Sequence, residues 1–379
     1  MAPAVIDLKT AEDPRDAVQQ AVAALAEGKL VAVPTETVYG IAASALSESA
    51  VQKLIDVKNR DGKPLALAIK SSDDALDYVP GMSPLAQRLS RRCWPGPVTL
   101  VLKDNHPDSV LTRLPAAVQS AVTQQGNVGL RVPANEHTLN LLRLSAGPLV
   151  LSSANLGGHP PATTAEQVVE QLGDSVDLIL DDGPSRFGQA STVVQVTDET
   201  FEVLREGVVS AETLAQLTFY LALVVCTGNT CRSPMGEGIL RDMLAQKIGC
   251  DAAALPDRGI SVRSAGIAAM PGGQPALQAV DVMNDMRIDI TNHASQPVTD
   301  QLAKHADLIL TMTNGHRNAL VAQWPELAVR THLFSNGNTD ISDPIGQPKP
   351  IYAGCADQLK TFASHWVDVI VNQALPGNS

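Results

Sequence analysis

Aromatic residues are scarce in this chain of 379 residues, which has 5 Phe, 3 Trp and 4 Tyr. Its cores must therefore be built from Ala, Val, Leu and Ile, which suits buried strands flanked by helices. Long apolar runs are also missing, because the longest, such as residues 220–226, are far too short to cross a bilayer. The first residues, MAPAVIDLKTAEDPRD, lack the basic and apolar regions of a secretory signal. These absences predict a cytoplasmic protein with no membrane partner.

Cysteine is too sparse for a disulfide-rich protein, and positive charge is too sparse for a general polyanion binder. The five cysteines show none of the dense, even spacing of a disulfide framework, so we expect free thiols. The net charge is −12; residues 1–212 hold 17 basic and 26 acidic residues, and the rest hold 11 and 14. Neither part is a general polyanion binder, so we expect no extensive direct binding of nucleic acid.

The order of apolar segments predicts two α/β domains. Up to about residue 212, short Val- and Leu-rich runs alternate with segments of helical period, such as residues 13–28 and 47–60. A new buried strand, FYLALVVC, begins at residue 219 and is followed by alternating helical and strand-like segments. We therefore expect a first domain over residues 1–212 and a second, doubly wound domain with a parallel sheet over residues 219–379.

The strongest chemical signal is the segment LALVVCTGNTCRSPMGEGILRDML, which begins at residue 221. A buried strand leads into a tight loop from Cys226 to Arg232, and Pro234 predicts a helix that begins near Ser233. Such a loop collects backbone N–H groups, a helix dipole and a guanidinium around one point, which favours a phosphate dianion. The same positive field stabilises a cysteine thiolate, the form of cysteine that acts as a nucleophile.

This second half resembles the low-molecular-weight protein phosphatases over about residues 219–370, through CTGNTCRSP, SAG at 264–266, HAS at 293–295, ADLILTM at 306–312 and a late Asp-Pro. The resemblance implies a phosphocysteine intermediate on Cys226, with Arg232 as phosphate clamp and Asp343 as general acid. It implies support of the loop by the residues Asn229, Thr230, Ser233 and Cys231, of which Cys231 can also trap the oxidised nucleophile as a disulfide.

The substrate of this domain stays open between phosphoarginine and phosphotyrosine. Thr230 stands where tyrosine-specific relatives usually carry a larger apolar residue and where relatives resembling protein-arginine phosphatases carry Thr. Ile345 follows the Asp-Pro pair where both branches commonly place an aromatic ring. We favour phosphoarginine, with phosphotyrosine as the alternative.

The first half has no Walker loop and no GxGxxG fingerprint, so any nucleotide must be held in another way. Polar clusters lie instead at the ends of its expected strands, which is where α/β sheets build sites. In chain order they are PTETVYG at 34–40, KNR at 58–60, WPGPVTL at 94–100, LRVP at 130–133, SSANLGG at 152–158, STVV at 191–194 and LREG at 204–207.

Together and in this order the clusters resemble the threonylcarbamoyl-AMP synthase (YrdC-like) family over about residues 12–208, which implies a twisted mixed sheet. The resemblance implies threonine contacts at Thr35, Arg131 and Ser191. It implies ATP contacts at Lys58, Arg60, Ser153, Asn155 and Arg205. Magnesium would accompany ATP as substrate, and we expect no dedicated metal site and no tightly bound cofactor. The 61–65 segment looks one residue shorter than the family pattern, so its course stays open.

The sequence therefore predicts a bifunctional enzyme. The first domain would convert L-threonine, bicarbonate and ATP into threonylcarbamoyl-AMP and pyrophosphate, for tRNA threonylcarbamoyladenosine formed with downstream tRNA-modification enzymes. The second would be a cysteine-dependent phosphatase acting on a phosphorylated protein. The alternative is a phosphatase alone, whose first domain only binds nucleotide or RNA and regulates it.

Overall fold

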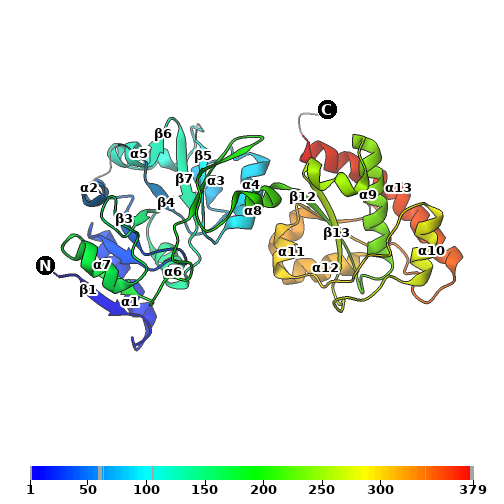
Figure 1. Ribbon diagram of the computed structural model, residues 1–379, viewed down its shortest axis with the longest axis horizontal. Coiled ribbons are helices and arrows are strands. Elements are labelled where there is room, and N and C mark those ends of the chain that lie inside the picture. The colour runs from blue at the N-terminus through cyan, green and yellow to red at the C-terminus, as the bar shows by residue number, and fades with distance from the viewer. Residues whose placement is uncertain (1, 59–61, 63, 105, 338, 376–379) are drawn as a thin grey trace. The chain divides into compact units, whose positions relative to one another are not determined.

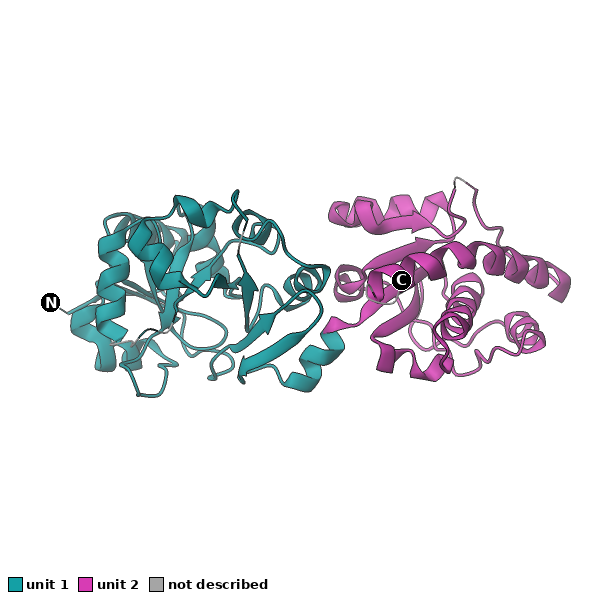
Figure 2. Ribbon diagram, turned by 90° about the horizontal axis from the view of Figure 1, so that it is seen from above, with its two compact units in different colours: residues 1–217 teal, residues 218–379 magenta. Residues whose placement is uncertain are grey.

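The computed structural model describes residues 2–58, 62, 64–104, 106–337 and 339–375. The chain divides into two compact units, residues 1–217 and 218–379 (Figure 2). The division falls at the end of helix α8, Ala211–Thr218. At the start of this helix the hydroxyl of Ser210 accepts the N–H of Thr213 and so caps the first turn.

The first unit carries one large sheet and eight α-helices among its described residues (Figure 1). Its strands are β1 Ala4–Asp7, β2 Val31–Val33, β3 Gly40–Ser44, β4 Ala66–Ala68, β5 Val98–Lys103, β6 Thr123–Gln124, β7 Asn127–Arg131, β8 Leu149–Ser153, β9 Leu178–Asp181, β10 Thr192–Val196 and β11 Phe201–Arg205. Its other helices are α1 Pro14–Ala26, α2 Glu48–Lys58, α3 Ala75–Tyr78, α4 Pro84–Cys93, α5 Ala116–Val122, α6 Glu136–Leu144 and α7 Ala165–Leu172.

The sheet of the first unit is mixed, in the order β1-β9-β2-β3-β8-β4-β7-β5-β10-β11, with β6 paired to β7. Successive strand residues point to opposite faces, so each strand contributes side chains to both faces of the sheet. One face packs against α2, α4, α5 and α7. Helices α1 and α6 cover part of the other face, around β2, β3 and β8. The rest of that second face, over β4, β7, β5 and β10, is left to a cavity.

The second unit holds a smaller sheet in the order β13-β12-β14-β15, and every pairing in it is parallel. Its strands are β12 Tyr220–Cys226, β13 Ile260–Gly266, β14 Leu308–Thr311 and β15 Thr331–Leu333. Its helices are α9 Arg232–Ile248, α10 Leu277–Asp285, α11 Asp300–His305, α12 Asn314–Gln323 and α13 Lys349–Ala374.

Helices cover both faces of this parallel sheet. Helices α9, α10 and α13 pack on one face and α11 and α12 on the other, so all seven residues of β12 are buried. The strand order reverses around β12, which is the point at which open α/β sheets form ligand sites beyond the carboxyl ends of their strands. Cys226 is the last residue of β12. The topology therefore places the predicted nucleophile where a site is expected.

The two sheets confirm the expected fold class, a twisted mixed sheet followed by a doubly wound parallel sheet. Helix α9 begins at Arg232, slightly earlier than the start near Ser233 that Pro234 predicts. Cys93 and Trp94 are buried, and the Trp94–Pro95 peptide is cis. No helix among the described residues is both long and apolar enough to span a membrane.

Candidate active sites

A cavity of about 640 Å³ lies on the partly uncovered face of the first sheet. Small residues at alternating strand positions form its floor, namely Gly40, Ala66, Ala68 and Gly129. Five of the predicted substrate residues line the same cavity, although they are spread over 170 positions of sequence: they are Thr35, Arg131, Ser153, Ser191 and Arg205. The fold thus brings together both predicted groups, for threonine and for ATP.

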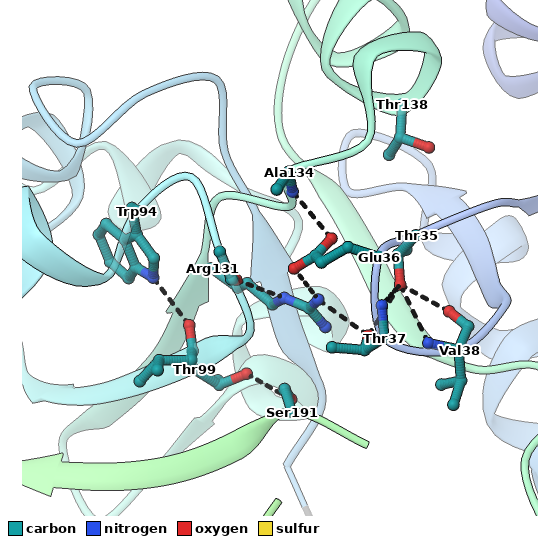
Figure 3. Close-up of polar contacts among 12 residues, drawn as sticks. Thr35, Glu36, Thr37, Val38, Trp94, Thr99, Arg131, Ala134, Thr138 and Ser191 are labelled. Carbon is teal, nitrogen blue, oxygen red and sulfur yellow. Dashed lines mark hydrogen bonds and ion pairs between the residues drawn. The ribbon is translucent and has the colours of Figure 1, made fainter. Parts of the chain in front are cut away.

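Arg131 is anchored in the cavity wall by a buried ion pair with Glu36 (Figure 3). Its Nη2 donates to Glu36 Oε1 at 2.7 Å and to Thr37 Oγ1 at 2.9 Å, and its Nε donates to the Gly96 carbonyl at 3.3 Å. The second oxygen of Glu36 accepts the Ala134 N–H at 2.8 Å. Arg131 and Glu36 are each only 8% exposed, so the pair is held in a low-dielectric setting where loss of either charge is costly.

This anchoring determines which part of the guanidinium can meet a ligand. Both N–H groups of Nη2 and that of Nε are used within the protein, whereas Nη1 of Arg131 has no hydrogen-bond partner among the described residues. A carboxylate bound in the cavity would therefore meet Nη1. That gives one charge-assisted hydrogen bond with a fixed direction rather than the two-pronged grip that arginine often provides.

The remaining predicted threonine contacts, Thr35 and Ser191, are each held by hydrogen bonds. The hydroxyl of Thr35 donates to the Val38 carbonyl at 2.6 Å, which closes the turn after β2. Ser191 Oγ lies 3.1 Å from Thr99 Oγ1 (Figure 3). Arg205 donates from Nη2 to both the carbonyl and the hydroxyl of Ser191, at 2.7 and 3.2 Å. A predicted ATP residue and a predicted threonine residue are therefore in direct contact.

Lys58 differs from the other predicted ATP residues because its ammonium is buried against three oxygens of its own chain. Its Nζ donates to the Ser153 carbonyl at 2.8 Å, to the Asn155 carbonyl at 2.6 Å and to Asn155 Oδ1 at 2.9 Å. Neither Lys58 nor Asn155 lines the cavity, but both hold Ser153, which does. Arg60 lies outside the described residues, as do residues 61 and 63 of the 61–65 segment.

Replacement of Lys58 by methionine is expected to lower the free energy of unfolding of the first unit by about 2–4 kcal/mol, because buried carbonyls lose their donor. Calorimetric unfolding of the full chain measures this as a downward shift of one transition. Lys53→Met is the matched control, since Lys53 lies on the same helix, is exposed and reaches a single carbonyl, that of Gly28. If the first unit unfolded at the same temperature in both variants, the hydrogen bonds of Lys58 would not stabilise it.

In the second unit, Cys226 lies at the start of a loop that folds back on its sulfur. Ser233 Oγ is 2.9 Å from Cys226 Sγ, and the backbone N–H of Asn229 donates to the same sulfur at 3.3 Å. Asn229 has a φ of 55°, in the left-handed region that asparagine tolerates better than most residues. The 17-residue helix α9 begins directly after the loop and directs its dipole and unpaired first-turn N–H groups toward it.

A chain of hydrogen bonds sets the direction of the Ser233 hydroxyl. Ser264 donates to a carboxylate oxygen of Glu237 at 2.6 Å, so its oxygen accepts one N–H of Asn229 at 2.9 Å. The other N–H of Asn229 donates to Ser233 Oγ, also at 2.9 Å. Because Ser233 already accepts from Asn229, its own proton is left for Cys226. Glu237 thus takes the Ser264 proton, and the Asn229 amide, whose Oδ1 accepts the Gln296 N–H at 2.9 Å, can only donate to the two serines.

Arg232 and Asp343 form an ion pair beside the loop. Arg232 Nη2 lies 2.5 Å from Asp343 Oδ2, and its Nη1 donates to the Ile341 carbonyl at 3.1 Å. The arginine side chain is 6% exposed, whereas that of Asp343 is 42% exposed. The predicted clamp and the predicted acid are therefore adjacent, with the acid on the solvent side where a leaving group would depart.

The second loop cysteine faces inward. Cys231 Sγ lies 3.4 Å from the hydroxyl of Tyr352 on α13, and 3.7 Å from the hydroxyl of Thr230. Burial raises the pKa of the nearby Cys355 thiol to about 12, which keeps that thiol protonated and unreactive. All five cysteines are free.

Sequence reasoning missed several residues that the structure places in these sites. In the first unit it missed Glu36, although a buried arginine needs a partner and PTETVYG contains an acidic residue. In the second, His293 Nε2 donates to the Asn229 carbonyl at 2.8 Å, and Gly266 lets β13 approach the loop so closely that a Cβ would meet Thr227 and Asn229. No local sequence signal identifies Tyr352, Glu237 or His316, whose partners are remote in sequence.

The fold and the two sites define a two-domain α/β protein with a cavity on the face of a mixed sheet and a cysteine-arginine phosphate loop. The chain belongs to the threonylcarbamoyl-AMP synthase family through its first unit and to the low-molecular-weight protein phosphatase family through its second. The family model described as "Telomere recombination" (Sua5, YciO and YrdC) matches residues 23–207. The model described as "Low molecular weight phosphotyrosine protein phosphatase" matches residues 222–375.

Two relatives each match one half of the chain. The "Putative threonylcarbamoyl-AMP synthase" of Mycobacterium tuberculosis is 39% identical over 198 residues, which is 52% of this chain and 87% of that protein. The "Protein-arginine-phosphatase" of Bacillus subtilis is 33% identical over 142 residues, which is 36% of this chain and 88% of that protein. A solved structure of Pyrococcus abyssi Sua5 covers 87% of this chain and 98% of its own, with 23% identity and a TM-score of 0.50, and shows similarity of fold alone.

Proposed function

We propose that the chain is a bifunctional enzyme: an L-threonylcarbamoyladenylate synthase joined to a cysteine-dependent protein phosphatase. Both domain types are present, and relatives of both kinds carry enzyme names. The synthase proposal is carried by the single cavity that collects Thr35, Arg131, Ser153, Ser191 and Arg205. The phosphatase proposal is carried by Ser233 and the loop amide directed at the Cys226 sulfur.

In the synthase, two anions must be brought together. The amine of L-threonine takes up bicarbonate with loss of water, and an oxygen of the resulting carbamate attacks the α-phosphorus of ATP as pyrophosphate leaves. Arg131 Nη1 would hold the threonine carboxylate, and Arg205 would face the developing phosphate charge. Catalysis would come from positioning and charge neutralisation. Magnesium enters as part of the MgATP substrate, and the described residues contain no cluster of three potential metal ligands.

The decisive experiment is pyrophosphate release from ATP by the full-length protein, with L-threonine and bicarbonate each added and omitted. Release that requires both supports the synthase. No release from a folded protein whose phosphatase is active would instead support the alternative, in which the first unit only binds nucleotide or RNA and regulates the second. Each half of the chain matches a relative that is named as an enzyme, which favours the bifunctional proposal over that alternative.

In the phosphatase, the Cys226 thiolate would attack phosphorus and form a phosphocysteine. The electron pair of the broken bond would pass to the leaving atom, a guanidine nitrogen or a phenol oxygen, which takes a proton from Asp343. Arg232 would bind two phosphoryl oxygens, and water would then release phosphate from the sulfur. Thr230 and Cys231 would support the loop. Phosphoarginine in a protein is the proposed substrate, with phosphotyrosine as the second candidate.

Asp343→Asn is expected to slow phosphatase turnover about a hundredfold or more while phosphate binding is retained, because an amide cannot donate the proton that the leaving group needs. Steady-state turnover and titration with inorganic phosphate measure the two properties separately. The matched control is Asp340→Asn, three residues earlier, whose carboxylate accepts from the Asn314 backbone N–H rather than from Arg232. Full turnover in Asp343→Asn would remove this residue from the mechanism.

The proposed setting follows from the same chemistry. A thiolate nucleophile and five free cysteines suit a reducing compartment, so we propose the cytoplasm. Threonylcarbamoyl-AMP is a reactive mixed anhydride, so downstream tRNA-modification enzymes are the proposed users of the product. The net charge of −12 supports a hand-over between proteins rather than extensive direct contact with tRNA.

A further inference from the structure

A buried histidine lies between two threonine hydroxyls at the edge of the phosphatase loop. His316, on α12, is 5% exposed. Its Nε2 is 2.8 Å from Thr227 Oγ1, and its Nδ1 is 2.9 Å from Thr313 Oγ1. Thr227 directly follows the predicted nucleophile Cys226 and is itself exposed. A ring held from both sides thus fixes the position of a hydroxyl that solvent and ligands can reach.

The charge state of the ring follows from its surroundings. Burial, followed by the charge of Arg232, lowers the pKa of His316, and the weaker opposing influences are Asp343 and Asp340. The ring is therefore neutral at neutral pH, with one nitrogen donating and the other accepting. Thr313 Oγ1 accepts the backbone N–H of His316, and in one tautomer it gives its own proton to Nδ1. Nε2 then carries the ring proton and donates it to Thr227.

With this arrangement, Thr227 Oγ1 keeps both a proton and a lone pair for a ligand. In the opposite tautomer it would give its proton to Nε2 and keep two lone pairs. Either way, at least one lone pair is available on the residue that directly follows Cys226, and the backbone at this point is held because the Thr227 carbonyl accepts the Ala268 N–H at 3.0 Å. The hydroxyl is thus a pre-oriented acceptor, which is more useful to a ligand than a freely rotating one.

We propose that Thr227 is a substrate-contacting residue that accepts an N–H of a phosphorylated guanidine, and that His316 is the positioning residue that holds it. This inference rests on the proposed phosphatase function and deepens it. A phosphoguanidine presents N–H groups next to phosphorus, whereas an aryl phosphate presents none. The Thr227–His316 pair therefore favours phosphoarginine by a contact that phosphotyrosine cannot make.

The test compares kcat/KM for N-phospho-L-arginine with kcat/KM for p-nitrophenyl phosphate in the full-length protein. Thr227→Val removes the hydroxyl and keeps the branched shape. In this variant the ratio of kcat/KM for N-phospho-L-arginine to kcat/KM for p-nitrophenyl phosphate is expected to fall about tenfold, which is the effect of one hydrogen bond made to the substrate. His316→Met is expected to lower the ratio similarly, while His316→Gln, whose amide N–H can replace Nε2, is expected to recover part of it.

Further variants separate substrate contact from loop support. The double variant Thr227→Val/His316→Met is expected to show no lower ratio than Thr227→Val alone, since both remove the same contact. His332→Gln, an exposed histidine on β15, is the control and should leave the ratio unchanged. Equal losses on both substrates in folded Thr227→Val, or an unchanged ratio, would overturn the inference alone. If the unaltered protein hydrolysed neither substrate, the phosphatase proposal would fall with it.

Discussion

Replacement of Arg131 by methionine is expected to reduce threonine-dependent pyrophosphate release about a hundredfold or more, because the cavity loses the guanidinium that we assign to the threonine carboxylate. The same change is expected to lower the free energy of unfolding by about 3–5 kcal/mol, since Glu36 would be left as a buried, unpaired charge. Pyrophosphate assays and calorimetric unfolding measure the two effects on the same preparation.

A second substitution separates the two effects. In Arg131→Met/Glu36→Gln no charge is left uncompensated, so most of the lost stability should return, whereas pyrophosphate release should stay low. Phosphatase turnover in the second unit serves as an internal control for protein quality. Retained threonine-dependent release in the single variant would remove Arg131 from the threonine site. Recovery of release in the double variant would show that Arg131 acts only by neutralising Glu36.

Cys226→Ser is expected to abolish phosphatase turnover, with a loss of about ten-thousandfold or more, because a serine hydroxyl in this loop lacks the nucleophilicity of a thiolate. The loop amides and Arg232 remain, so binding of inorganic phosphate should persist. Pyrophosphate release by the first unit should be unchanged. The measurements are single-turnover and steady-state hydrolysis of N-phospho-L-arginine together with a phosphate titration.

A matched control for this change is Cys355→Ser, which alters a buried thiol to which we assign no part in catalysis or in phosphate binding. That variant should keep phosphatase turnover. Persistent hydrolysis in Cys226→Ser would assign the nucleophile to another group and would leave the hydrogen bonds to its sulfur without a catalytic explanation.

The sequence predicted the fold class and the clusters of the first site because both depend on local pattern. Polar residues at the ends of apolar runs meet at one edge or face of a sheet, and Thr35, Arg131 and Ser191 do so. Their roles stay predictions. The partner of Arg131 could not be predicted, because Glu36 lies 95 positions away and only the folded sheet brings the two together.

Lys58 shows a second limit of sequence reasoning. The family resemblance implies an ATP contact for Lys58, which stays a prediction, and the structure adds hydrogen bonds from its ammonium to three oxygens of Ser153 and Asn155, at the end of β8 and just after it. A sequence cannot reveal how many acceptors surround an ammonium. The contacts to the Cys226 sulfur were easier to predict, since they span at most seven positions, whereas Tyr352 and His316 come from distant helices.

The alternation of the first sheet also bears on how this enzyme could change over evolution. Leu67, Leu100 and Leu130 belong to the core, while their strand neighbours Ala66 and Gly129 form the cavity floor. Positions that determine stability therefore alternate, along the same strands, with positions that determine which ligand the cavity accepts. Mutations at floor positions can reshape the cavity with little effect on packing, so new ligand preferences are open to selection without a prior gain in stability.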